Sequence, residues 1–99
     1  MAAAIPGLIV RLGKDHAVIL ASSPAGIALA PIIRAGADNQ RRGDVRIGGL
    51  PGNPFPVVRC SAAFVVGAGV AFQEIGLVGC LSALRMAAAR AAEAAAEGR

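Results

Sequence analysis

Residues 44–66, D-V-R-I-G-G-L-P-G-N-P-F-P-V-V-R-C-S-A-A-F-V-V, contain the pattern on which the predicted fold depends. Asp44–Ile47 is typical of a short strand. Gly49–Pro54 holds two glycines and two prolines in six residues, which restricts the backbone to a tight loop. The apolar run Phe55–Val66 then predicts a buried helix. The segment therefore predicts a strand, a tight loop and a helix N-terminus in succession.

The predicted helix N-terminus would make the loop a binding site for an anion. Asn53 is a favourable N-cap residue, and Pro54 suits the first helical position, where its missing N–H is not needed. Free backbone N–H groups and the positive end of the helix dipole favour a phosphate or another oxyanion there. We therefore expect a ligand to contact Gly49, Leu50, Pro51, Gly52, Asn53 and Pro54, with Asp44 beside them.

Charged residues precede this loop in the sequence. Arginines can hold a phosphate through two hydrogen bonds, and an aspartate can hold a divalent cation at that phosphate. A solvated polar loop is the alternative for any one of them. The candidates are Asp38, Arg41, Arg42, Asp44 and Arg46.

The hexapeptide at 49–54 resembles the signature loop of gephyrin-type molybdopterin molybdotransferases. Arg41–Val45 and the pattern Val57-Val58…Cys60…Phe64-Val65 are also similar to that family, so the resemblance covers roughly residues 28–70. It implies an α/β domain, dimerisation, and binding of molybdopterin, molybdate and magnesium. The Thr-Gly-Asp-Glu and Ser-Gly-Gly stretches of the family do not occur in this sequence. The resemblance therefore implies a binding module that is incomplete as an enzyme.

Two alternatives stay open. Met1–Gly7, with Ile9-Val10 and Ala17-Val18, resembles the start of HypC-type hydrogenase-maturation chaperones, which are OB-like barrels with a C-terminal helix. The working cysteine of that family follows the initiator methionine, and here this position is Ala2. The third interpretation is a non-catalytic interaction or shell-forming subunit.

The rest of the chain predicts alternating strands and helices. Leu8–Leu12 and His16–Leu20 read as a hairpin, and Ala25–Ala35 reads as helix or strand. Val70–Phe72 predicts a short strand, and Leu81–Glu97 an alanine-rich helix. Because long apolar runs suit strands that are covered on both faces, we expect an α/β fold with a short, mostly parallel or mixed sheet. Ninety-nine residues predict one domain, 1–99.

Composition argues against nucleic-acid binding. The formal net charge is +4, but the ten basic residues are scattered, and only three aromatic residues are available for stacking. Cys60 and Cys80 lie in apolar surroundings, which favours buried reduced thiols and a cytoplasmic location. We expect no signal peptide, since Ala2–Val10 has no basic residues before its apolar run and is interrupted by Pro6-Gly7.

The stretch Ala62–Leu84 is long enough to cross a bilayer and is bounded by Arg59 and Arg85. Gln73 and Glu74 fall near its middle, and a central acidic residue costs about 3 kcal/mol to insert. A membrane span is therefore the less favoured interpretation.

The sequence identifies no catalytic group and no metal site. His16 is the only histidine, and the two cysteines lie too far apart for a metal-ligand motif. Leu81–Glu97 is more informative, since it is apolar around most of its circumference and needs covering on more than one side. We therefore expect a homo-oligomer, most simply a two-fold dimer, that uses this helix.

Overall fold

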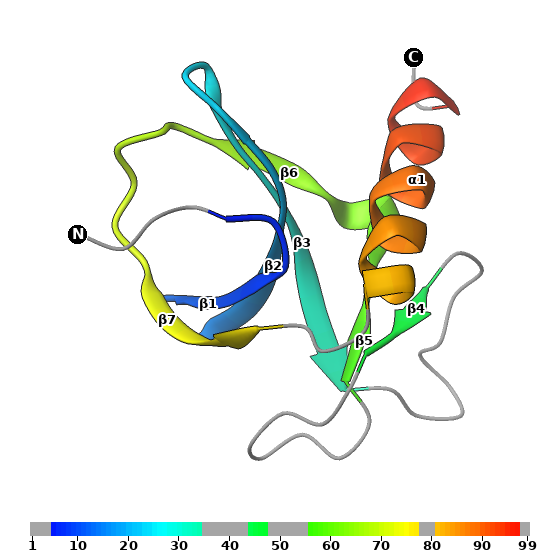
Figure 1. Ribbon diagram of the computed structural model, residues 1–99, viewed down its shortest axis with the longest axis horizontal. Coiled ribbons are helices and arrows are strands. Elements are labelled where there is room, and N and C mark those ends of the chain that lie inside the picture. The colour runs from blue at the N-terminus through cyan, green and yellow to red at the C-terminus, as the bar shows by residue number, and fades with distance from the viewer. Residues whose placement is uncertain (1–4, 35–43, 48–55, 78–80, 98–99) are drawn as a thin grey trace.

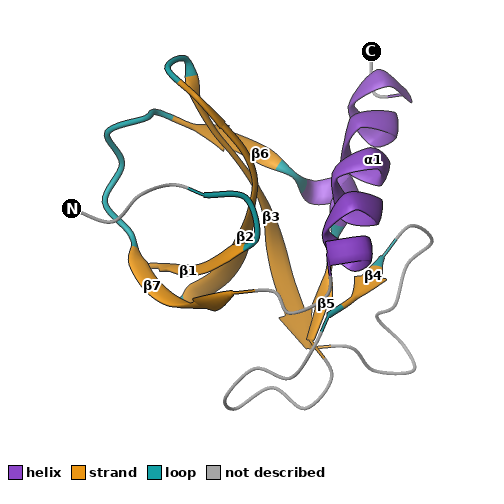
Figure 2. Ribbon diagram, viewed as in Figure 1, coloured by secondary structure: helices purple, strands orange, loops and turns teal. Residues whose placement is uncertain are grey.

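One curved antiparallel sheet and one C-terminal helix make up the computed structural model, which describes residues 5–34, 44–47, 56–77 and 81–97. The sheet bends round on one side, and the helix packs against its other face (Figures 1 and 2). The elements are β1 (Leu8–Leu12), β2 (Asp15–Ser23), β3 (Gly26–Arg34), β4 (Val45–Arg46), β5 (Pro56–Val58), the 3-10 turn η1 (Cys60–Ala62), β6 (Phe64–Val66), β7 (Gln73–Leu77) and α1 (Leu81–Glu97).

The expected α/β fold with a mostly parallel sheet is wrong. The strand order is β4-β5-β3-β2-β1-β7, with β6 also paired to β3, and every pairing is antiparallel. Parallel neighbours need a long crossover, usually a helix, whereas antiparallel neighbours need only a tight turn. The N-terminal strands are joined by such turns, so no crossover helix separates them.

The first three strands form a meander. Leu12 pairs with Asp15 around Gly13-Lys14, and Gly13 has φ +64°, which suits the first central residue of a type II′ turn. This confirms the predicted β1–β2 hairpin. Ser23 pairs with Gly26 at the next turn, where the Ser23 hydroxyl accepts a hydrogen bond of 3.2 Å from the Ala25 N–H. The ambiguous segment after it is therefore a strand.

The predicted helix Phe55–Val66 is wrong, because its described residues form β5, η1 and β6 along one edge of β3. Pro56 starts β5, a position that tolerates proline, and the β-branched pair Val57-Val58 favours extended backbone. Pro31 on β3 explains why the pairing along this edge of β3 stops between β5 and β6. The Arg59 N–H donates to the Pro31 carbonyl at 2.9 Å, but proline has no N–H to return the bond, and η1 follows immediately.

Two of the other predicted elements are close to those observed. Asp44–Ile47 contains the two-residue strand β4, and α1 has the predicted bounds. The strand expected at Val70–Phe72 is wrong, because these residues lie outside any strand; the next strand is β7, which begins at Gln73 and pairs with β1. Arg11 on β1 donates a 2.7 Å hydrogen bond to the Gln73 side chain across this pairing. No helix among the described residues is long and apolar enough to span a membrane.

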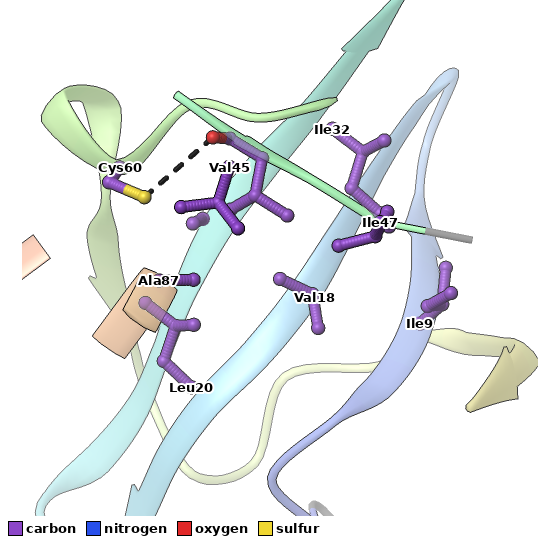
Figure 3. Close-up of a cluster of buried hydrophobic side chains, with 10 residues drawn as sticks. Ile9, Val18, Leu20, Ile32, Val45, Ile47, Cys60 and Ala87 are labelled. Carbon is purple, nitrogen blue, oxygen red and sulfur yellow. Dashed lines mark hydrogen bonds between the residues drawn. The ribbon is translucent and has the colours of Figure 1, made fainter. Parts of the chain in front are cut away.

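Buried side chains form two clusters on opposite faces of the sheet. The outer cluster lies under α1 (Figure 3) and comprises Ile9, Val18, Leu20, Ala30, Ile32, Val45, Ile47, Val58, Cys60 and Ala87. The inner cluster is enclosed by the curve of the sheet and comprises Leu8, Val10, Ala17, Ile19, Ile27 and Leu29. Neighbouring residues of a strand alternate between the two clusters, as the pleat requires. The sequence therefore correctly indicated strands covered on both faces, but one of the covers is the sheet itself.

Candidate functional site

A partly buried ion pair joins the residue before β4 to the residue after β5. Val45 pairs with Val58, so the same register places Asp44 opposite Arg59. The Arg59 guanidinium lies 3.3 Å from Oδ2 of Asp44, and the exposed fractions of the side chains are 14% for Arg59 and 1% for Asp44. Asp44 is thus held in the protein interior by a cation of the neighbouring strand.

Cys60 follows this pair and lies beneath α1. Its Sγ donates a hydrogen bond to the Val58 carbonyl at 3.7 Å, drawn as a dashed line in Figure 3. Burial raises the pKa of the Cys60 thiol above its usual 9.0. Arg90 of α1 partly offsets this effect, and Asp44 adds to it. Because only the thiolate is a strong nucleophile, Cys60 is a protonated and unreactive thiol at neutral pH.

His16 lies too far away to activate this thiol. It pairs with Ile32 of β3, which in turn pairs with Val58 of β5. Two strand spacings separate His16 from Val58, or about 10 Å. A general base must lie within hydrogen-bonding distance of the proton that it removes, directly or through one water. The sheet therefore keeps the two groups apart.

The loop Gly49–Pro54 lies outside the described residues, and so does Cys80. The structure does describe the two ends of the segment, where the Ile47 N–H donates a 3.1 Å hydrogen bond to the Pro56 carbonyl. Residues 48–55 thus connect β4 to β5 as the loop of an antiparallel hairpin. The helix N-terminus that was expected after Pro54 is wrong, because β5 begins at Pro56. A helix dipole therefore cannot supply anion binding there.

The charged residues expected around the loop are only partly described. Asp38, Arg41 and Arg42 fall outside the described residues, and Arg46 is exposed on β4. A divalent cation at Asp44 would have to share the carboxylate with the Arg59 guanidinium, which contacts Oδ2. Within the described part of the chain, no three His, Cys, Asp or Glu side chains are grouped to hold a metal ion.

Sequence reasoning missed Arg59 and Arg90. A usable signal existed for Arg59, since Asp44 and Arg59 have opposite charges and flank the Gly/Pro segment as a hairpin would place them. Arg90 gave no such signal. It approaches Cys60 only because α1 packs on η1, β2 and β4.

Apolar side chains are exposed on two other elements. Residues 62–72, A-A-F-V-V-G-A-G-V-A-F, contain no polar side chain, and only Val66 and Phe72 among them are half-buried. Val65 of β6 is 71% exposed. Met86 of α1 is 47% exposed. Apolar side chains on β6 with the loop after it, and Met86 on α1, are therefore exposed to solvent.

No family model matches this chain, and no curated protein sequence matches it.

Proposed function

We propose that the protein is an interaction subunit that assembles with further copies of itself. The exposure of apolar side chains in two places, on β6 with its following loop and on α1, is the observation that carries this proposal. Soluble monomers seldom expose contiguous apolar patches, and such patches mark sites of protein association. The partly buried groups Asp44 and Arg59 pair with each other inside one chain, whereas large apolar side chains such as Val65 and Met86 are exposed and free to contact another copy.

The test is the molar mass of the intact chain as a function of concentration. Light scattering after size-exclusion chromatography and sedimentation equilibrium, from about 5 to 500 μM, cover the affinities of weak and tight dimers. We expect the mass to rise toward a defined small oligomer. A mass of 9.8 kDa throughout this range would contradict the proposal.

Anion binding at Gly49–Pro54 is the second candidate function, in the form of a molybdopterin-biosynthesis module. One observation favours it: the hydrogen bond between Ile47 and Pro56 brings the two ends of the Gly/Pro loop together beside the exposed cation Arg46. A phosphate or pterin phosphate would then be held by loop N–H groups and arginine rather than by a helix dipole.

Amide NMR shifts test the second candidate. Phosphate, molybdate and molybdopterin are titrated separately to millimolar concentration, with Gly67 and Gly69 as controls remote in sequence. We expect shifts at Gly49, Gly52 and Asn53 that saturate, while the control glycines stay unchanged. Equal or absent shifts at the two sets of residues would refute anion binding at this loop.

A further inference from the structure

Solvent-exposed side chains form one continuous stripe along the outward face of α1, and they recur at heptad spacing. Positions 83, 84, 87, 88, 90, 91 and 94 are buried or half-buried. The exposed stripe runs along the other side of the helix, at the spacing by which one helix contacts another. It consists of Arg85, Met86, Ala89, Ala92, Glu93 and Ala96.

We propose that this stripe binds the same stripe of a second copy, with the two helices antiparallel and the two-fold axis at Ala89. The proposal rests on the self-association proposed above and assigns it a surface and a register. In a two-fold interface, a residue i of one copy that contacts residue j of the other is matched by residue j of the first copy contacting residue i of the second. With the axis at Ala89, Met86 meets Ala92 of the second copy, and Ala89 meets itself.

Charge complementarity selects this arrangement. Arg85 and Glu93 lie four residues on either side of Ala89, so Arg85 of each copy faces Glu93 of the other. Both side chains are exposed in the single chain. Two symmetric ion pairs therefore flank an apolar centre, and they specify orientation and register more than affinity.

Other arrangements of the same two helices bring like charges together. A parallel pair in register puts Arg85 beside Arg85 and Glu93 beside Glu93. Sliding the antiparallel pair by one heptad moves the axis next to Arg85 or next to Glu93, so that this residue approaches its own copy. Like charges placed opposite each other are unfavourable. The axis at Ala89 avoids both arrangements.

The apolar part of the stripe suits a close helix pair. Ala89, Ala92 and Ala96 are small, and the distance between packed helices depends on the side chains at the contact. A 17-residue helix is about 25 Å long, so the contact is smaller than a standard interface. We therefore expect a dissociation constant in the micromolar range, on the order of 10 μM.

Charge reversal tests the pairing. Arg85→Glu places two acidic residues opposite each other at both ends of the interface, and Glu93→Arg places two basic residues there. Each single variant should weaken the dimer at least tenfold by sedimentation equilibrium. An equimolar mixture of the two variants should form a heterodimer with an affinity within about threefold of wild type. In that heterodimer, the acidic residues 85 and 93 of the Arg85→Glu chain face the basic residues 93 and 85 of the Glu93→Arg chain. The double variant should also regain dimerisation.

Matched controls change the same charges elsewhere. Lys14→Glu in the β1–β2 turn and Glu74→Arg on β7 alter exposed residues outside α1. Both controls should leave the dissociation constant within about twofold of wild type, and circular dichroism should show the same fold for all variants.

Crosslinking tests the axis itself. In a Cys80→Ser background, Ala89→Cys should form a disulfide-linked dimer on mild oxidation, because the two copies of residue 89 meet on the axis. The control Ser82→Cys should not, since the two copies of residue 82 lie about 20 Å apart in this arrangement, well beyond disulfide reach.

Different results overturn different statements. A dimer that is unaffected by both charge reversals but lost on Val65→Arg refutes the helix interface and leaves the proposed self-association intact. Failure of the two single variants to form a heterodimer refutes the register. A monomer at 500 μM refutes both the interface and the proposed function.

Discussion

The two apolar clusters of this protein share the same strands but are closed by different means. The inner cluster is closed by strands alone, and its buried members are all aliphatic. The outer cluster is closed by α1, contains Cys60, and adjoins the Asp44–Arg59 ion pair. A cluster closed by strands is tied by hydrogen bonds between neighbours, whereas a helix over a sheet is held mainly by side-chain packing. Packing in the outer cluster should therefore relax more readily around a substituted side chain, so that substitutions there cost less stability. The adjoining ion pair is the exception.

The largest effect is expected at that ion pair. Asp44→Ala removes the Asp44 carboxylate from the partly buried Arg59 guanidinium, and breaking a buried pair costs about 3–5 kcal/mol. Urea unfolding measures the loss. The matched control replaces both residues by leucine, which removes the charges together and should recover most of the stability. A double variant no more stable than Asp44→Ala would show that packing around the pair, rather than charge, dominates.

A pair of leucines compares the two clusters directly. Leu29 belongs to the inner cluster and Leu20 to the outer one, and both are buried. Leucine-to-alanine changes in cores cost about 2–5 kcal/mol, depending on how far the surroundings can collapse. We expect about 4 kcal/mol for Leu29→Ala and about 2 kcal/mol for Leu20→Ala, because α1 can settle toward the gap. Equal losses in urea unfolding would contradict the difference between the clusters.

A substitution at Gly26 tests how closely β6 packs on β3, where these strands close the inner cluster. A Cβ at this position would meet the Val66 carbonyl oxygen at 2.7 Å, so β6 would have to move away from β3. Gly26→Ala should cost about 1–3 kcal/mol, as overpacking does. The matched control is Gly69→Ala, whose added Cβ meets nothing within 4 Å. Thermal unfolding should separate the two variants clearly, and similar melting temperatures would refute the close approach.

The smallest expected effect is the pH dependence of stability that comes from Cys60 in the outer cluster. Burial raises the pKa of Cys60 in the folded state above 9.0, so the unfolded chain releases this proton at a lower pH. The contribution of the neutral thiol to stability is therefore complete below about pH 8.5 and is lost as the pH rises through the raised pKa. We expect stability to fall as the pH rises from the pKa of the unfolded thiol through the raised pKa of Cys60, with Arg90 and Asp44 as the neighbouring charges. Cys60→Ala should flatten the decline, and an unchanged pH profile in that variant would exclude Cys60 as its source.

Local signals in the sequence were sufficient for the N-terminal hairpin and for α1. Gly13-Lys14 between two apolar runs specifies a two-residue turn, since glycine readily adopts the positive φ required there. The alanine-rich stretch from Leu81 has high intrinsic helix propensity and no internal glycine or proline. In both cases the residues that fix the conformation are neighbours in the chain. The loop Gly49–Pro54 and its ligands stay a hypothesis from sequence.

Only the tertiary structure decided the conformation of residues 56–66. Their apolar run fits a buried helix or a buried strand equally well by periodicity, and an edge of β3 was available to pair with them. Pro31, far away in sequence, then determined where that edge is interrupted. The partners of Asp44 and Cys60 likewise depend on pairing between β4 and β5 and on the position of α1. Such contacts join residues distant in the chain, so local propensity carries no information about them.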